Sequence, residues 1–170
     1  MNQRSIFTLS AITVLGLASL PGSTVAQQKS LKEQLVGAWT LVSCESTYAN
    51  GTKRSYCVSP NGILMLDASG RYASVTVARG RPKFTVPLGL ETKAEEFKAA
   101  GQGLAANFGS WSVNEANKTL TTHYDGAFAP NNEGTDLTRS VSLSGDELKL
   151  VSQSTVVTGG RTEGVYRRAK

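Results

Sequence analysis

Hydrophobic and polar residues alternate along short segments from Gly37 onward, and turn-forming residues separate these segments. Alternation with a period of two is typical of strands that bury one face. The segments are GAWTLVSCES, GILMLD, RYASVTVAR, NFGSWSV, KTLTTHYDG, TDLTRSVSL, ELKLVSQSTVV and TEGVYRR. Many short strands at regular spacing predict an all-β fold. We expect a single antiparallel barrel of about 8–10 strands, in which consecutive strands pair and no edge is left free.

The stretch CESTYANGTKRSYC holds both cysteines of the chain, Cys44 and Cys57, around the turn signal Asn50-Gly51. Asn-Gly favours a two-residue type I′ hairpin turn. With that turn Ala49 pairs with Thr52, and the two cysteines fall directly opposite each other, close enough for a disulfide. A redox or metal site is disfavoured, because there is no C-x-x-C spacing and no further ligand set. The pattern predicts a disulfide across the hairpin.

One short α-helix is expected between the strand segments, over residues 92 to about 100. Thr92 with Glu95 three residues later forms a capping-box pattern, and the glycines that follow end the helix. The preceding residues 79–90 contain two prolines. We expect them to form a loop over one end of the barrel.

The N-terminus has the three-part layout of a secretory signal peptide. A positive residue comes first, residues 5–20 are an uncharged and mostly apolar run, and Thr24 and Ala26 stand where a signal peptidase cleaves. An N-terminal membrane anchor is the alternative, but the run is short for a span. We therefore expect residues 1–26 to be removed and residues 27–170 to form the barrel domain. The mature protein is expected to be exported, periplasmic or secreted, where disulfides persist.

The net charge and the absence of known motifs exclude several classes of function. The 18 Lys and Arg residues against 13 Asp and Glu give a net charge of +5, and the basic residues are scattered. A scattered modest charge favours solubility and does not indicate a nucleic-acid partner. The chain has no Gly-x-Ser-x-Gly elbow, phosphate loop or spaced His/Cys ligand set. We expect no cofactor, no metal and no membrane span after processing.

Four stretches resemble the bacterial lipocalin-like domain family: GAWTLVS, GRYASVTVARGRPKF, FGSWSVNEANKTLTTHYDGAFAPNNEGTDLTR and LSGDELKL. The resemblance runs from about Leu35 to Arg168. It implies a calycin-type barrel with an internal cavity for a small, largely hydrophobic molecule. Gly37-Ala38-Trp39 resembles the Gly-x-Trp of lipocalins, in which the Trp closes one barrel end against a basic residue of the last strand. Arg167 or Arg168 would take that role here.

Arg139 lies in a strand segment where alternation puts it on the same face as Leu137 and Val141. An arginine on an apolar face is uncommon unless paired. It can meet a ligand carboxylate or an acid of the chain, Asp125 or Glu133, and the internal ion pair is the favoured interpretation. The candidate ligand-binding residues are Tyr72, Arg79, Phe108, Trp111, His123 and Arg139. Trp39 and Trp111 are each better explained as core residues, because small barrels fill their interiors with side chains.

His123 is the only histidine, and Asp125 shares its strand face. A cofactor-free isomerase, cyclase or hydrolase on this barrel would need both residues to face the cavity. Alternation does not decide which face of this strand points inward, and a solvent-facing or hydrogen-bonded strand histidine is the simpler interpretation. The leading hypothesis is therefore an exported binder and not an enzyme. The third hypothesis is a ligand-free barrel that acts through its surface or through residues 79–90. Ligand identity and oligomeric state are left open.

Overall fold

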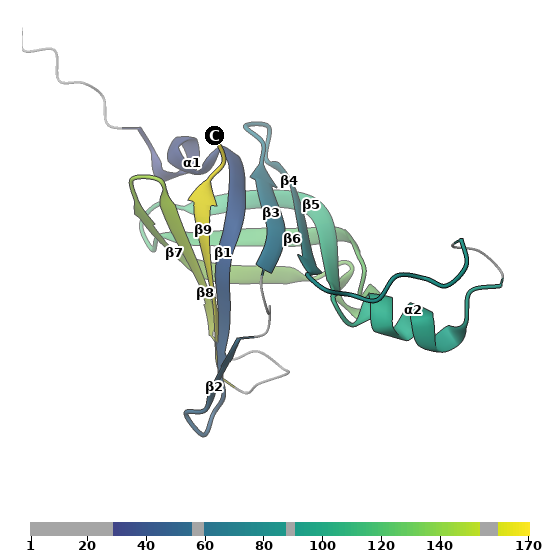
Figure 1. The fold of residues 1–170 in the computed structure, drawn as a ribbon. Coiled ribbons are helices and arrows are strands. Elements are labelled where there is room, and N and C mark those ends of the chain that lie inside the picture. Colours follow the sequence, from purple (N-terminus) through teal and green to yellow (C-terminus); the bar gives the residue numbers. More distant parts are fainter. Residues whose placement is uncertain (1–28, 56–59, 88–90, 154–159) are drawn as a thin grey trace, which may run out of the picture.

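A single antiparallel sheet, closed by the pairing of its first and last strands, forms the barrel seen in Figure 1. The computed structural model describes residues 29–55, 60–87, 91–153 and 160–170. Within them the order β2-β1-β3-β4-β5-β6-β7-β8-β9, with β1 also paired to β9, makes an eight-stranded barrel to which β2 is added. This confirms the predicted all-β barrel. The strands are β1 Gly37–Thr47, β2 Lys53–Ser55, β3 Pro60–Leu66, β4 Arg71–Ala78, β5 Leu104–Asn114, β6 Thr119–Ala127, β7 Asp136–Ser144, β8 Glu147–Gln153 and β9 Arg161–Arg168.

The predicted helix is present as α2, Ala94–Gly101, and begins two residues later than expected. Glu96, and not Glu95, caps its start: the backbone N–H of Lys93 donates to the Glu96 carboxylate at 3.3 Å. The same carboxylate accepts the N–H and the hydroxyl of Thr85, at 2.9 and 2.8 Å. The helix therefore begins later than predicted, because Glu96 can bind both the backbone of Lys93 and the loop residue Thr85. A 3-10 turn, η1, spans Pro130–Asn132.

A five-residue helix that the alternation pattern does not reveal, α1 Leu31–Leu35, closes one end of the barrel. Ser30 and Glu33 form a capping box at its start. The backbone N–H groups of Leu31 and Lys32 donate to the carboxylate of Glu115 at 2.9 and 3.0 Å, which ties α1 to the end of β5. The helix ends in fully buried Leu35, so it plugs this end with an apolar side chain.

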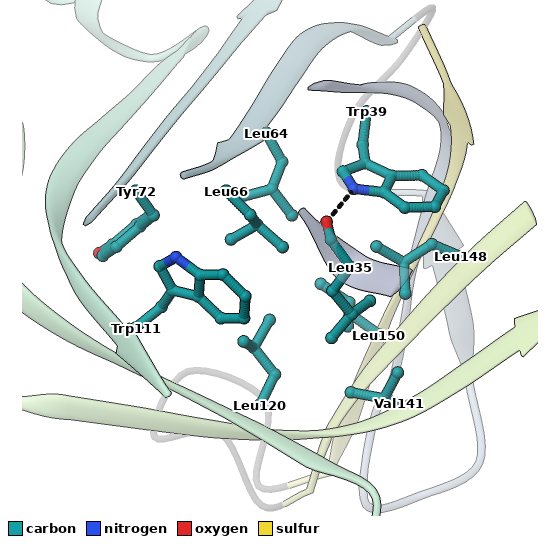
Figure 2. Close-up of a cluster of buried hydrophobic side chains, with 10 residues drawn as sticks. All are labelled: Leu35, Trp39, Leu64, Leu66, Tyr72, Trp111, Leu120, Val141, Leu148 and Leu150. Atoms are coloured by element: carbon teal, nitrogen blue, oxygen red, sulfur yellow. Dashed lines mark hydrogen bonds between the residues drawn. The ribbon is translucent and has the colours of Figure 1, made fainter. Parts of the chain in front are cut away.

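The main core lies at this closed end (Figure 2). Inward side chains from most of the strands meet α1 there, which removes their apolar surface from water and drives closure of the barrel. The indole N–H of Trp39 donates to the Leu35 carbonyl at 2.8 Å, so the buried polar atom is satisfied. The cluster comprises Leu35, Trp39, Leu64, Leu66, Tyr72, Trp111, Leu120, Val141, Leu148 and Leu150.

The first hairpin forms, but the predicted two-residue turn is wrong. Tyr48 and Thr52 close the turn, with the Tyr48 N–H donating to the Thr52 carbonyl at 2.8 Å. Gly51 has φ +83° and stands third in a three-residue loop. A three-residue loop with a left-handed glycine is the next most common hairpin connection. The strand register therefore differs by one residue from the expected pairing of Ala49 with Thr52; Glu45, for example, pairs with Ser55.

The disulfide stays a prediction, because Cys57 lies outside the described residues. Cys44 itself is buried on the inner side of β1. It faces inward because a β-bulge between Leu41 and Ser43 shifts the alternation of β1 by one residue.

The loop before α2 packs on that helix. The rings of Phe84 and Phe97 lie 5.9 Å apart, and the Arg81 guanidinium donates to the Ala100 carbonyl at 3.0 Å. The described part of the loop and α2 project from the barrel beside the end opposite α1 (Figure 1). The described part of the loop therefore does not cover that end, contrary to the prediction. Among the described residues no helix has the length and apolar character needed to cross a membrane. The predicted signal peptide lies outside the described residues and stays an expectation.

Candidate functional site

The inner face of β6 is decided by burial. Leu120 and Thr122 are buried, whereas His123 and Asp125 lie on the exposed face. On the neighbouring strand β7, Val141 is buried and Arg139 shares its face. Thr122, Tyr124 and Arg139 therefore point into the half of the barrel that α1 does not fill.

Arg139 is an arginine without an acidic partner. The 13 Asp and Glu residues of the chain all lie within the described residues, and none of the ion pairs among these involves Arg139. The favoured ion pair with Asp125 or Glu133 is thus not formed; Asp125 pairs with Arg71 at 2.6 Å. Within the described residues, Nη2 of Arg139 donates a long hydrogen bond of 3.5 Å to the Thr122 hydroxyl, and Nε is buried with no partner.

Three tyrosines lie around this guanidinium. Burial, aided by the nearby Tyr124, raises the pKa of Tyr72 to about 12, although Arg139 acts in the opposite direction. Burial also raises the pKa of Tyr124 and of Tyr166, again against the lowering effect of Arg139. The Thr122 side chain also hydrogen-bonds the Tyr72 hydroxyl and lowers its pKa, an effect smaller than that of burial. All three phenols are therefore neutral at physiological pH and can donate a hydrogen bond.

Two cavities open inside the barrel, and Tyr166 borders both. One has a volume of about 140 Å³ and is lined by Leu137, Arg139, Leu150, Ser152, Thr162, Gly164 and Tyr166. The other has a volume of about 170 Å³ and lies toward the end of α2, lined by Leu41, Thr76, Ala78, Gln102, Gly103, Leu104, Ala105 and Tyr166. Tyr166 is the residue that the two linings share.

At the closed end, Arg168 is the arginine that meets Trp39. Its guanidinium carbon lies 4.1 Å from the centre of a Trp39 ring. It also donates to the carbonyls of Gln34 and Val36, at 2.8 and 3.2 Å, so one side chain links β9, β1 and α1. Arg167 is exposed. The geometry at Arg168 is that of a structural clamp.

The predicted ligand-binding residues are dispersed. Tyr72 and Trp111 lie in the buried core (Figure 2). The indole N–H of Trp111 donates to the Asp67 carbonyl at 2.9 Å. Arg139 faces the interior cavity. Phe108 is 53% exposed and points outward, and Arg79 is exposed at the end of β4. The structure therefore brings together Arg139 and Tyr72 and leaves Phe108 and Arg79 outside the barrel.

His123 lies in a charged row on the outer surface. Its Nδ1 is 2.7 Å from the Asp136 carboxylate, and its Nε2 is 3.9 Å from that of Asp125. The side chain of His123 is 45% exposed. An enzyme built on His123 and Asp125 in the cavity is not supported by this placement. Among the described residues no group of three or more His, Cys, Asp or Glu is arranged to hold a metal ion.

The residues that line the interior were mostly missed from the sequence. Tyr166, Ser152 and Thr162 have no motif of their own. Tyr166 could have been predicted to face inward, because it lies two residues from Arg168 on the same strand and residues two apart share a face. The small hydroxyl residues offered no comparable signal.

Phe108 lines a further hollow, on the outside of the barrel. This outer groove has a volume of about 590 Å³ and is lined by Ala73, Val75, Ala106, Asn107, Phe108, Asp125, Gly126, Ala127, Phe128 and Glu133. Strand register extends its apolar floor across the outer face, since Phe108 pairs with Ala73 and Ala73 pairs with Met65. It differs from the interior site in being open to solvent, with exposed carboxylates near the aromatic rings.

Comparison with known proteins identifies the family of this chain. The model of the lipocalin-like domain family matches residues 36–166. Neither the curated proteins nor the solved structures contain a match. The family match spans most of the chain and nearly the whole barrel, with Trp39 and the Arg139 cavity inside it. This chain therefore belongs to the lipocalin-like domain family.

Proposed function

We propose that this protein is an exported binder that holds a small, largely hydrophobic molecule inside its barrel. The observation that carries the proposal is the unfilled half of the interior, where two cavities meet at Tyr166. Ligand pockets combine apolar walls with a few placed polar groups. The cavity beside Arg139 follows that rule, with Leu137 and Leu150 as walls and one guanidinium.

The volumes limit the ligand. Pockets for drug-sized ligands occupy about 300–1,000 Å³, whereas a cavity of about 150 Å³ holds benzene. The cavity of about 140 Å³ beside Arg139 thus fits a molecule of one ring or a short chain. A larger ligand requires Tyr166 to turn and join the two spaces.

The test is native mass spectrometry of the mature protein purified from its own cell envelope. We expect a bound small molecule, and a polypeptide that begins near Gln27. Thr162→Phe, which fills the Arg139 cavity, should release the molecule while circular dichroism shows an intact barrel. A wild-type protein free of any bound molecule, or a Thr162→Phe variant that keeps its cargo, would contradict the proposal.

A role of the outer face is the second candidate function. Ile63, Met65, Val75 and Phe108 are all exposed, and register places them on neighbouring strands. An exposed apolar surface of this kind often marks an interaction site. Phe108→Ser should then abolish association measured by sedimentation velocity and leave cargo in the cavity unchanged. Loss of cargo from that variant would instead place the ligand in the outer groove.

A further inference from the structure

We propose that the ligand of the interior cavity is a small monocarboxylate, whose carboxylate binds Arg139 and whose apolar part lies against Leu137 and Leu150. This inference rests on the proposed function and names the chemical class of its ligand. It concerns the cavity lined by Leu137, Arg139, Leu150, Ser152, Thr162, Gly164 and Tyr166.

The first reason is the charge of Arg139. A guanidinium has five N–H donors and stays protonated at all physiological pH values. Within the described residues only the Thr122 hydroxyl accepts from it, at 3.5 Å, and Nε is buried without a partner. A buried charge without a counter-charge is costly to folding. An anionic ligand supplies the acceptors and the negative charge that the chain itself does not bring to this position.

The second reason is the chemistry of the side chains around Arg139. Around Arg139 the barrel places neutral hydroxyl groups, including those of Tyr72, Tyr124 and Tyr166. The nearest acid that acts on them, Asp125, pairs with Arg71 and forms no ion pair with Arg139. Phenolic and alcoholic O–H groups donate to a carboxylate without adding a competing negative charge. The buried Tyr72 hydroxyl points away from the leucine side chains of the closed-end core (Figure 2). These donors suit an oxyanion better than a neutral ligand.

The third reason is size and polarity. The cavity of about 140 Å³ has leucine walls on one side and the Arg139 guanidinium on the other. A ring-sized apolar group fills a space of this volume. One charged head and one apolar body of about five or six carbons together match the lining. A dianion such as phosphate has no apolar part that could pack against Leu137 and Leu150.

The experiment is isothermal titration calorimetry with two matched pairs of probes, benzoate with benzamide and hexanoate with hexanamide. Each pair keeps the shape of the ligand and removes only the negative charge. We expect each acid to bind the wild-type protein at least about 10-fold more tightly than its amide, because charge-assisted hydrogen bonds are the stronger kind. Equal affinity within both pairs, or binding of neither acid, overturns the carboxylate assignment.

The variants place the effect at Arg139. Arg139→Met should weaken binding of the acids by about 10- to 100-fold and leave the amides unchanged. Arg139→Lys keeps the charge and loses the planar fork, so it should retain part of the preference for the acid. Arg167→Met makes the same change on the exposed face of β9 and should have no effect. Undiminished acid binding by Arg139→Met overturns the proposal, even if the barrel still carries a cargo in native mass spectrometry.

Discussion

For Arg139, the sequence predicts the orientation of the side chain but not its interactions. Alternation with Leu137 and Val141 predicted an inward arginine, and the structure confirms that it shares the face of buried Val141. The predicted ion pair of Arg139 with Asp125 is absent, because Asp125 lies on the outer face of β6 and pairs with Arg71 across the sheet. Which face of β6 turns inward depends on the closure of the whole barrel, and a single strand does not carry that information.

Arg139→Met is predicted to stabilise the ligand-free protein. The substitution removes a half-buried interior charge, whose Nε is fully buried and which no acid of the chain compensates, and it keeps most of the side-chain volume. We expect the free energy of unfolding in urea to rise by about 1–3 kcal/mol. Arg167→Met, on the exposed face, should change it by no more than about 0.5 kcal/mol. A loss of stability in Arg139→Met would mean that the guanidinium has a structural partner in the barrel.

Tyr72 makes stability sensitive to alkaline pH. Its pKa is raised from 10.0 to about 12 in the fold, chiefly by burial. Between these two values the folded state keeps a proton that the unfolded chain has lost. The contribution of Tyr72 is therefore complete below about pH 10 and is lost as the pH rises toward 12.

We expect the free energy of unfolding, measured in urea at several pH values above about 9, to fall less steeply in Tyr72→Phe than in the wild type. Tyr124 and Tyr166 have pKa values shifted in the same direction, so part of the slope remains. Identical slopes in the two proteins would show that Tyr72 does not hold its proton more tightly in the fold.

At the scale of elements, alternation located the strands and turn chemistry located the hairpins. The errors arose where one residue was inserted or absent. The hairpin at Asn50-Gly51 has a three-residue loop, and a bulge after Leu41 shifts the alternation of β1 by one residue. Phe108 and Trp111 were both assigned to the ligand wall, although an odd separation along a regular strand puts them on opposite faces. A bulge adds one residue without any composition signal, so local pattern alone misses it.

Gly109 is predicted to be indispensable to the pairing of β5 with β6. A Cβ at this position would overlap the carbonyl oxygen of His123 and come within 2.9 Å of the Asp125 backbone nitrogen. Because both atoms belong to backbone next to the bulge, neither can move without breaking the ladder. Gly109→Ala should lower the free energy of unfolding by about 1–3 kcal/mol or more. Ser112→Ala on the same strand is the control, and an equal effect of the two substitutions would refute the steric argument.

The disulfide predicted between Cys44 and Cys57 can be tested through stability. Cross-linking a loop of this length stabilises a protein by roughly 3 kcal/mol on the chain-entropy estimate. Reduction of the exported protein should therefore lower its Tm by roughly 5–10 °C while the barrel stays folded, as seen by circular dichroism. A variant with both cysteines changed to serine should not respond to reductant. Thiols that label freely in the native exported protein would exclude the disulfide.

At the scale of the whole molecule, the barrel has two unlike ends. At one end Leu35, Trp39 and Arg168 form a sealed core with the short helix α1. In the other half the interior contains Arg139, Tyr166 and two small cavities. Family resemblance predicted the fold and the Gly-x-Trp closure motif, because these depend on residues shared by such barrels. The cavity depends on side chains brought together from several strands, which becomes visible only once the register is known.

The central claim is that the ligand lies inside the barrel and is held by Arg139. The most direct measurement is a crystal structure of the mature protein with its co-purified molecule, or with benzoate if none is recovered. We predict electron density for a carboxylate within hydrogen-bond distance of the Arg139 guanidinium, with the apolar part against Leu150 and beside Tyr166. Ligand density in the outer groove at Phe108, with an empty interior, would contradict the claim.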